Sequence, residues 1–520
     1  MNPACEHPPL ITAMLNPATY DHPVDKLQLI ETHISWVILA GQYAYKLKKP
    51  VNLGFLDFST LEKRRFYCAE ELRLNHRLAP SIYLQLVSIT GSAEHPSLNG
   101  SGEAIEFAVK MNQFPQDAQL DRMLNRGELL PEHIDGMAGF IADFHRNATV
   151  ADPAMPYGDP EHIYMPVMEN FQQIESRITD THHLKTLEAL QQWTKTAFDK
   201  LRPVFRLRKA KGYIRECHGD LHLRNLAWVN QNPLAFDCIE FNPNFRWIDV
   251  FSDIAFLIMD LEDRGQPRLA QRFLNHYLEQ SGDYAGIQTL RFYLTYRALV
   301  RAKVDAIRCT QEGIDRQEQK EAEADFCSYL RLAEHYTQPS QARLIITHGP
   351  SACGKTTLTQ PLLEQLGAIR LRSDVERKRL FGLNTDERAD TELGKGIYTA
   401  DSTEQTYQKL AELASMILDA GYPVIIDATC QQPAQRARFQ QLAFQKQLPY
   451  VILEFSASTA TLHKRINNRA GDASDADRQV LDHQLAHWHP LQKDEAKFTI
   501  NIDTETRFDA PSVSEKIRSL

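Results

Sequence analysis

The chain has 520 residues, of which 43% are hydrophobic and 24% charged, and its formal net charge is −9. This composition excludes a disordered, collagen-like or small disulfide-stapled protein, and it provides no global basic field for nonspecific binding of nucleic acid. The eight cysteines form no C-x-x-C pair, so the sequence indicates neither a zinc ribbon nor a disulfide framework. Signal-peptide features and apolar runs of membrane-spanning length are also lacking, and we expect a cytoplasmic protein without membrane association.

Short strands and one helix are predicted at the start of the chain. Residues 33–40 and 42–49 alternate in the manner of a hairpin that turns at Gly41. Residues 60–78 have the apolar spacing of a helix, and residues 104–114 indicate a further strand. These elements predict a small, strand-rich lobe.

Helical patterns dominate the middle of the chain, where one strand-rich segment, 225–241, interrupts them. The Pro/Ser/Gln stretch 337–341 is the best candidate for a linker. Beyond it, short apolar runs alternate with helical segments, which predicts a parallel sheet flanked by helices. These runs are 342–348, 368–373, 422–427, 450–455 and 497–502. We therefore predict a first domain over 1–336, whose helical lobe covers 114–336, and a second domain over 342–520.

A phosphate-binding loop is predicted where the strand over 342–348 ends. The stretch GPSACGKT fits G-x-x-x-x-G-K-[ST], and its glycines allow several backbone N–H groups to point at one anion. The following helix would add its positive dipole end. We expect Lys355 to bridge the β- and γ-phosphates and Thr356 to ligate Mg²⁺. The predicted nucleotide-binding residues here are Gly349, Ser351, Cys353, Gly354, Lys355, Thr356 and Thr357.

Two carboxylates follow at predicted strand ends. Asp427 stands where a Walker-B acid would orient Mg²⁺, and its alternative role is to cap the next turn. Asp374 is expected at the same edge of the sheet, where it would accept the proton of a substrate hydroxyl. The alternative role of Asp374 is to cap the helix that follows it.

Basic residues accompany these acids. Arg465 and Arg469 lie one helical turn apart, and as lid arginines they would neutralise charge on the transferred phosphoryl group. The alternative is a solvated, charged helix face. Arg377, Lys378 and Arg379 would bind an anionic substrate or lie exposed.

Residues 342–520 resemble the family of predicted P-loop kinases, whose relatives include gluconate kinase, zeta-toxin-type kinases and the kinase domain of polynucleotide kinases. The resemblance rests on GPSACGKTT, on SD followed by basic residues, on VIIDAT and on the Arg-rich lid. It implies phosphoryl transfer from ATP to a hydroxyl. The motifs are specific for this reaction class and weak for the substrate.

A second constellation is CHGDLHLRN, which begins at Cys217 and precedes the strand-like AFDCIEF. Phosphoryl transfer requires an acid that accepts the hydroxyl proton, an Asn that binds Mg²⁺ and a further Asp beyond a hairpin. Asp220, Asn225 and Asp237 have this arrangement. A metal site of Cys and His alone is the alternative, which the tight loop predicted by Gly219 disfavours.

This arrangement resembles protein-kinase-like folds, and the form HGDLHLRN resembles their aminoglycoside phosphotransferase and choline kinase branch. The resemblance covers roughly residues 25–335. It implies that Lys46 of AYKLKK contacts the α- and β-phosphates and that Glu71 positions this lysine. The rivals are Lys48 and Lys49 for the lysine and Glu70 for the acid. No G-x-G-x-x-G precedes Lys46, so the cover over the phosphates must be shortened or built differently.

Together, the two constellations predict a protein-kinase-like α+β domain joined to an α/β P-loop kinase domain. This fusion resembles bacterial proteins described as bifunctional aminoglycoside phosphotransferase/ATP-binding proteins. The predicted cofactors are ATP and Mg²⁺. The predicted catalytic residues are Asp220, Lys355, Asp374, Arg465 and Arg469, and the predicted metal ligands are Asn225, Asp237, Thr356 and Asp427.

Three functions are compatible with these residues. The first is a bifunctional kinase that phosphorylates hydroxyl groups of small molecules at two sites. In the second, one domain senses nucleotide and only the other is catalytic. In the third, the P-loop domain phosphorylates a 5′-hydroxyl of nucleic acid, which the acidic net charge disfavours.

Overall fold

The computed structural model describes residues 7–54, 56–311, 313–339, 341–384, 387, 396–468 and 476–520. Contacts divide the chain into two compact units. The first comprises Met1–Phe140, Phe144–Met165 and Phe205–Asp260, and the second comprises Ile141–Asp143, Pro166–Val204 and Leu261–Leu520. This division runs through the helical lobe of the predicted first domain, so the boundary at 337–341 stays a prediction.

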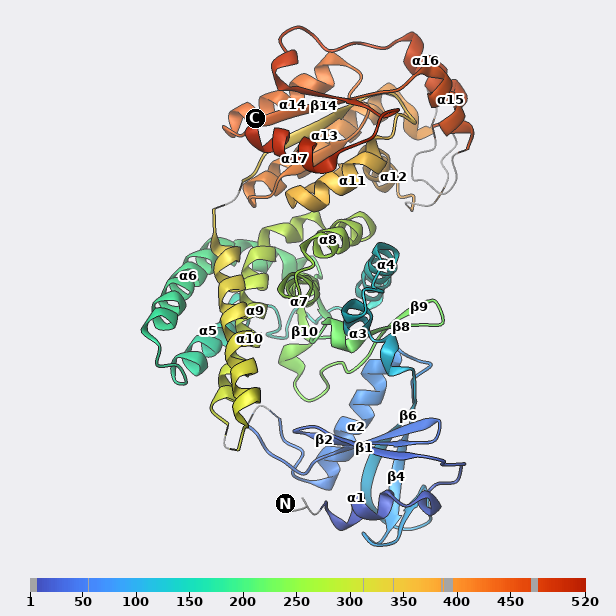
Figure 1. Cartoon of the computed structure of the whole chain (residues 1–520), viewed down its shortest axis with the longest axis vertical. Coiled ribbons are helices and arrows are strands. Elements are labelled where there is room, and N and C mark those ends of the chain that lie inside the picture. The colour runs from blue at the N-terminus through green and yellow to red at the C-terminus, as the bar shows by residue number, and fades with distance from the viewer. Residues whose placement is uncertain are drawn as a thin grey trace. The chain divides into compact units, whose positions relative to one another are not determined.

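A six-stranded antiparallel sheet with the order β1-β2-β3-β6-β4-β5 opens the first unit. Its strands are β1 (Leu27–Glu31), β2 (Ser35–Ala40), β3 (Tyr43–Lys48), β4 (Tyr83–Gly91), β5 (Pro96–Leu98) and β6 (Ala104–Asn112). The predicted hairpin is β2–β3, and Gly41 at its turn has a φ of 58°, which favours glycine. Helix α2 (Leu61–His76), capped by the Thr60 side chain, packs on β4 and β6 (Figure 1).

Helices and two small two-stranded sheets follow in the first unit. The helices are α3 (Leu120–Asn125) and α4 (Pro131–Asn147), and α7 (Val250–Asp263) ends it. The paired strands are β7 (Ile214–Glu216) with β10 (Trp247–Asp249) and β8 (Leu226–Val229) with β9 (Asn232–Ala235). The strand-rich segment predicted at 225–241 therefore contains the β8–β9 hairpin.

The second unit contains a parallel sheet and the long helices that precede it in sequence. These helices include α8 (Pro267–Ser281), α9 (Ile287–Cys309) and α10 (Arg316–Thr337), while α5 (Pro160–Glu175) and α6 (Thr181–Ala210) each contribute residues to both units. Helices α9 and α10 pack against each other, and α8 packs against the first helix of the P-loop region.

The parallel sheet has the order β12-β13-β11-β14-β15. Its strands are β11 (Leu344–His348), β12 (Ile369–Arg372), β13 (Val424–Asp427), β14 (Tyr450–Ser456) and β15 (Thr499–Asp503). The chain winds from β11 towards one edge and later returns to the other side of β11. The carboxyl end of β11 is therefore the point at which open α/β sheets bind ligands.

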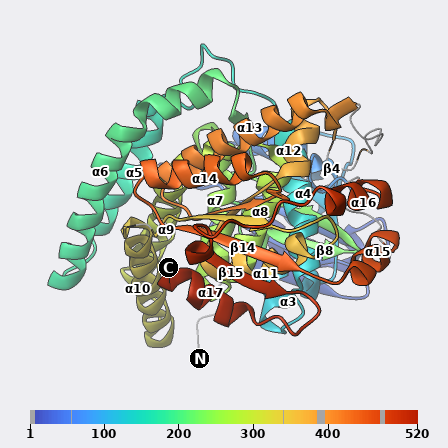
Figure 2. The same cartoon turned by 90° about the horizontal axis from the view of Figure 1, so that it is seen from above.

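Helices cover both faces of this sheet, as predicted (Figure 2). One face carries α13 (Ala400–Asp419) and α14 (Pro433–Gln445), and the other carries α11 (Lys355–Leu366) and α17 (Ala510–Ser519). Strands β11 and β13 are buried along their whole length, which explains their continuous apolar runs. The remaining α-helices of the described residues are α12 (Ser373–Leu380), α15 (Thr459–Asn467) and α16 (Arg478–Ala486) in this region and α1 (Pro9–Met14) ahead of the first sheet. Within the described ranges, no helix combines the length and apolarity that a membrane crossing requires.

His348, the last residue of β11, makes the stability of this sheet depend on pH. Its ring is fully buried beside Trp488, and burial lowers its pKa from 6.5 to about 4. The folded state therefore keeps a neutral ring while the unfolded chain gains a proton as pH falls below 6.5. Stability conferred by the neutral ring is lost between pH 6.5 and about 4, and the loss at pH 5 is about 2 kcal/mol.

We expect His348→Asn to remove most of this pH dependence. Hydrogen exchange of the β11 amides at pH 7 and pH 5 measures the opening free energy of the sheet. The wild type should lose more opening free energy than the variant over this interval. Equal losses in both proteins would contradict the burial of a neutral His348.

Candidate active sites

Backbone geometry at the end of β11 builds the predicted phosphate-binding loop. Gly354, with a φ of 96°, is the N-cap of α11 and directs the chain into this helix. At Gly349, an added Cβ would lie 2.7 Å from Cys353 Sγ and 2.8 Å from the Phe455 carbonyl oxygen, so a side chain would disrupt the turn. The Cys353 side chain is buried in the apolar core, which leaves only its backbone for the predicted contact with a nucleotide.

Lys355, Thr356 and Asp427 meet at this loop. Lys355 Nζ donates to the carbonyl oxygens of Gly349 at 2.9 Å and Pro350 at 2.8 Å. Thr356 Oγ1 donates to Asp427 Oδ2 at 2.7 Å, although the two residues are far apart in sequence. The structure thus joins the two predicted Mg²⁺ ligands of this site.

A cavity of about 1120 Å³ extends from the loop. Asp374 and Arg465 line it, together with Ser351, Gly354, Lys355, Thr356, Thr357 and Asp427. Asp374 lies in the first turn of α12, whose N-cap is Arg372, so capping is not the role of Asp374. Arg465 Nη1 donates to the Cys353 carbonyl oxygen at 3.3 Å, which brings the guanidinium to the loop. Arg469 lies outside the described residues.

The basic residues around Asp374 are largely buried. Arg372 and Arg377 line the cavity, whereas Lys378 is 1% exposed. Arg377 Nη1 donates to the Ile397 carbonyl oxygen and to Thr403 Oγ1, and within the described ranges its Nε lacks a hydrogen-bond partner. The alternative of exposed side chains is therefore wrong for Arg377 and Lys378, which are buried, whereas the Arg379 side chain is 30% exposed.

The ligands that Mg²⁺ prefers are carboxylate and hydroxyl oxygens. Asp427 and Thr356 offer this donor set next to the loop that would hold the phosphates. The residues therefore fit Mg²⁺, and Asp427 and Thr356 would hold it; when bound, it would supply positive charge that neutralises the phosphates.

Lys46 is the centre of the predicted site in the first unit. Its Nζ lies 2.7 Å from Glu71 Oε1 and 2.6 Å from Asp237 Oδ1. Glu71 is fully buried on α2, and Asp237 follows β9 with a φ of 64°. The predicted lysine, helix acid and metal-binding acid are thus in direct contact.

Lys48, the alternative to Lys46 for contacting the phosphates, is buried and pairs with two acids instead. It lies 2.7 Å from Glu71 Oε2 and is paired with Glu240. Burial raises the pKa of Glu240, while the charges of Lys46 and Lys48 outweigh burial at Glu71 and lower its pKa. The other rivals bind elsewhere, because Lys49 pairs with Glu31 and Glu70 pairs with Arg73.

Asp220 lies in the loop that follows β7. Its Oδ2 accepts a hydrogen bond from Asn225 Nδ2 at 3.0 Å and lies 3.2 Å from His222 Nε2. The Asn225 carbonyl oxygen accepts from the N–H of Phe236 at 3.0 Å, which joins this loop to the segment that carries Asp237. The two predicted Mg²⁺ ligands, Asn225 and Asp237, are therefore held on neighbouring segments, and their carboxamide and carboxylate oxygens suit this ion.

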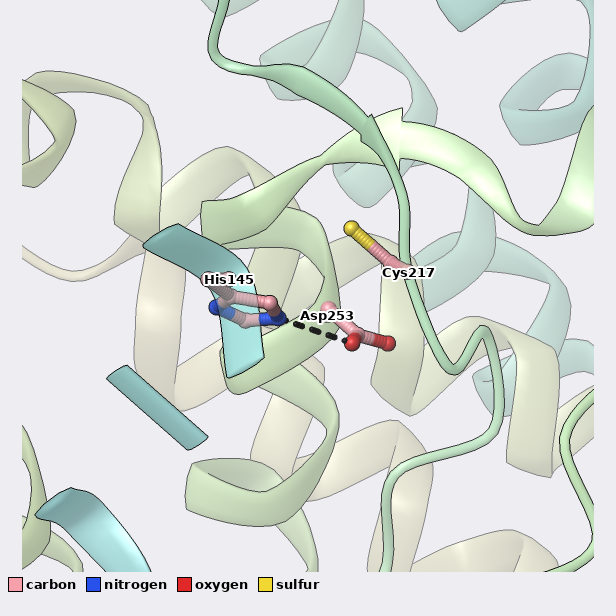
Figure 3. Close-up of side chains that lie close together, drawn as sticks. All are labelled: His145, Cys217 and Asp253. Carbon is pink, nitrogen blue, oxygen red and sulfur yellow. Dashed lines mark hydrogen bonds and ion pairs between the residues drawn. The ribbon is translucent and has the colours of Figure 1, made fainter. Parts of the chain in front are cut away.

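The buried Asp253 fixes the backbone of the loop that carries Asp220. Its Oδ1 accepts from the N–H of Gly219 at 2.8 Å, and its Oδ2 accepts from the N–H of His218 at 3.1 Å. His145 and Cys217 lie beside it at distances that a metal ion could bridge (Figure 3). However, burial raises the pKa of the Cys217 thiol well above its ordinary value, so Cys217 stays protonated and suits packing better than metal ligation.

Some of these contacts had no signal in the sequence. The approach of Arg372 Nε to within 4.0 Å of Asp427 Oδ2 follows from the pairing of β12 with β13. The sharing of Glu71 by two lysines depends on how α2 packs on the sheet. Alternation along β3 places Lys46 and Lys48 on one face, so the spacing KLK was the one available indication.

Comparison with known families agrees with this description. The model of the phosphotransferase enzyme family matches residues 97–293, and the model of an AAA domain matches residues 344–491. The predicted combination of a phosphotransferase domain and a P-loop domain in one chain is confirmed. The chain is an ATP-dependent kinase-type phosphotransferase.

The uncharacterized protein Rv2004c of Mycobacterium tuberculosis is 31% identical over 469 residues, which are 89% of this chain and 91% of the relative. The chain belongs to the same family as this protein. Among solved structures, the amicoumacin kinase hAmiN shares 14% identity over 62% of this chain and 92% of its own, with a TM-score of 0.38. A sugar kinase from Janibacter sp. HTCC2649 shares 20% identity over 34% of this chain and 93% of its own, with a TM-score of 0.27.

Lys46 and Lys48 should respond differently to substitution. Lys48→Met leaves Glu240 and part of Glu71 as uncompensated buried charges, which should cost about 3–5 kcal/mol of stability. Lys46→Met should cost less, because Glu71 keeps Lys48 and Asp237 is 47% exposed. Hydrogen exchange of the α2 and β3 amides measures both losses. A larger loss in Lys46→Met would contradict the structural role of Lys48.

Proposed function

We propose that the chain is a bifunctional enzyme in which two Mg²⁺-dependent sites each transfer the γ-phosphate of ATP to a hydroxyl group of a small molecule. A cytoplasmic location suits this use of ATP. One observation carries the proposal: each site gathers a lysine, two oxygen ligands for a metal and a carboxylate that is available as a base. These are Lys355, Thr356, Asp427 and Asp374 in one site and Lys46, Asn225, Asp237 and Asp220 in the other.

In the P-loop site, the backbone N–H groups between Gly349 and Lys355 would hold the β-phosphate, and Lys355 would exchange its two carbonyl partners for phosphate oxygens. Arg465 would stabilise charge on the transferred phosphoryl group. Asp374 would accept the proton of the acceptor hydroxyl. Arg377, buried beside the acceptor end of the cavity, favours an acceptor that carries an anionic or strongly polar group.

In the other site, Lys46 would hold the α- and β-phosphates, and Glu71 would keep its ammonium group in place. Asp220 would accept the hydroxyl proton. Asn225 supports this role, because its hydrogen bond at 3.0 Å fixes the orientation of the Asp220 carboxylate. The turn between β1 and β2 consists of Thr32, His33 and Ile34 without glycine, so the phosphates would be covered by a short turn.

This short turn also supports the alternative in which the first site only senses nucleotide. A third function, phosphorylation of nucleic-acid ends, would need a basic surface near Asp374. Because Arg377 and Lys378 are buried, they offer no exposed track for a phosphate backbone, and small-molecule acceptors fit the site better.

Lys355→Ala should lower ATP-dependent phosphorylation at the P-loop site by about 100- to 1,000-fold, because it removes a preorganised positive charge from the transferred phosphate. Transfer of labelled γ-phosphate to a metabolite extract by the full chain measures this. Lys464→Ala is the matched control, since Lys464 is exposed on the same helix as Arg465. If Lys355→Ala forms the same labelled products as the wild type in the same amounts, the proposal that this site is catalytic is wrong.

Asp220→Ala should lower the rate at which a different set of labelled products forms by about 100- to 10,000-fold, which is the range for loss of a general base. Asp199→Ala, which removes an acid that is 75% exposed on α6, is the control. If Asp220→Ala changes no product while nucleotide binding depends on Lys46, the first site is a sensor. If neither Asp220→Ala nor Lys355→Ala changes any product, the bifunctional proposal fails.

A further inference from the structure

Helix α8 precedes the P-loop region in sequence and seals the edge of its sheet. Strand β12 is an edge strand, which leaves one side of its backbone without a neighbouring strand. Asn275 on α8 covers this side, because its Oδ1 accepts from the N–H of Arg370 at 2.8 Å and its Nδ2 donates to the Ala368 carbonyl oxygen at 3.0 Å. Gln271 donates to the same carbonyl oxygen at 2.7 Å. Side chains of α8 thus make hydrogen bonds to this edge that a neighbouring strand would otherwise make.

One turn after Asn275, Glu279 meets two arginines. Its Oε1 lies 3.1 Å from Arg370 Nη2, and its Oε2 lies 3.5 Å from Arg372 Nη1. The two arginines alternate along β12 and therefore share a face. Burial alone would raise the pKa of Glu279, but Arg370 and Arg372 outweigh it and lower the pKa, so the side chain is a carboxylate at neutral pH.

Both arginines continue to the predicted Mg²⁺ ligands. Arg370 Nη1 donates to the Thr356 carbonyl oxygen at 3.0 Å, which fixes the first turn of α11. Arg372 Nε lies 4.0 Å from Asp427 Oδ2, the oxygen that accepts from Thr356 Oγ1. One buried carboxylate therefore restrains the cations next to both ligands.

The charge of Glu279 decides what Arg372 does. While Glu279 is a carboxylate, it holds Nη1 of the Arg372 guanidinium at 3.5 Å, and Nε stays at 4.0 Å from Asp427 Oδ2. Without that charge, Arg372 would be drawn to the Asp427 carboxylate and would compete there with Mg²⁺. Arg370 would also lose the counter-charge that keeps it against Thr356.

We propose that Glu279 is a positioning residue of the P-loop site and sets its affinity for Mg²⁺-nucleotide through Arg370 and Arg372. This inference rests on the proposed function of that site. Glu279 lies inside the segment 97–293, which matches the phosphotransferase enzyme family, so that segment supplies a functional residue to the P-loop site. Glu279 and the P-loop site belong to the same compact unit.

The test uses the full chain and a fluorescent ADP whose binding is followed as MgCl₂ is titrated, with EDTA in a parallel series. We expect Glu279→Gln to raise the Mg²⁺ concentration for half-maximal binding by about 10- to 100-fold, the range for residues that orient metal ligands. Binding in EDTA should stay within about twofold of the wild type. Glu279→Asp, which keeps the charge on a shorter side chain, should shift in the same direction by less.

Glu364→Gln is the matched control. Glu364 pairs with Arg272 across the same α8–α11 contact at 3.2 Å, so this variant weakens the docking of α8 without changing Glu279. Its Mg²⁺ dependence should equal that of the wild type. The double variant Glu279→Gln/Arg372→Gln should recover much of the affinity, because the competing cation is gone.

The outcomes separate this inference from the proposed function. If Lys355→Ala binds Mg²⁺-nucleotide as tightly as the wild type does, the proposed function of the P-loop site is overturned, and this inference is overturned with it. Intact wild-type binding with equal Mg²⁺ dependence in Glu279→Gln and Glu364→Gln overturns the inference alone. So does a loss in Glu279→Gln that is as large in EDTA as in Mg²⁺, since that is the result of a structural role. If Glu279→Gln does not fold, Glu279→Asp decides on the same criteria.

Discussion

A site that handles a nucleotide needs cations, and a buried cation must be compensated before the nucleotide arrives. This constraint organises both candidate sites. Lys46 and Lys48 share the fully buried Glu71, and Arg370 and Arg372 share Glu279. An isolated buried charge costs several kcal/mol, so each acid is as necessary to the fold as the cation that it holds.

The two sites meet this constraint in different ways. Lys355 is compensated by two backbone carbonyl oxygens, which are neutral dipoles that phosphate oxygens can displace at low electrostatic cost. Lys46 is held by full carboxylates, of which Asp237 is itself a predicted metal ligand. If Asp237 held a metal ion, its attraction for Lys46 would be weaker, and the Lys46 ammonium group would be available to phosphate. Under the proposed function, the first site would therefore depend more strongly on metal and nucleotide arriving together.

Local patterns in the sequence predicted much of this structure. Three features follow from residues that are close together in the sequence: the hairpin at Gly41, the parallel sheet and the phosphate loop. The structure contains all three. Strands β1, β4 and β5 were missed, because their residues alternate only weakly between buried and exposed. The meeting of Thr356 with Asp427 could be expected, since parallel strands end at one edge of a sheet.

Contacts that join distant elements could not be predicted in this way. Glu279 is an ordinary acid of an amphipathic helix until α8 packs on β12, and nothing in its own neighbourhood in the sequence marks it. The same packing explains why the compact units do not follow the predicted linker at 337–341: α8 packs on β12 and α11, and α9 packs on α13. Asn275 on α8 makes hydrogen bonds at the sheet edge, and Glu279 on α8 compensates two arginines. Helix α8 therefore contributes to the stability of the P-loop fold, although its sequence matches the other family. Separating the two catalytic regions at the linker would therefore remove a buried counter-charge from the second one.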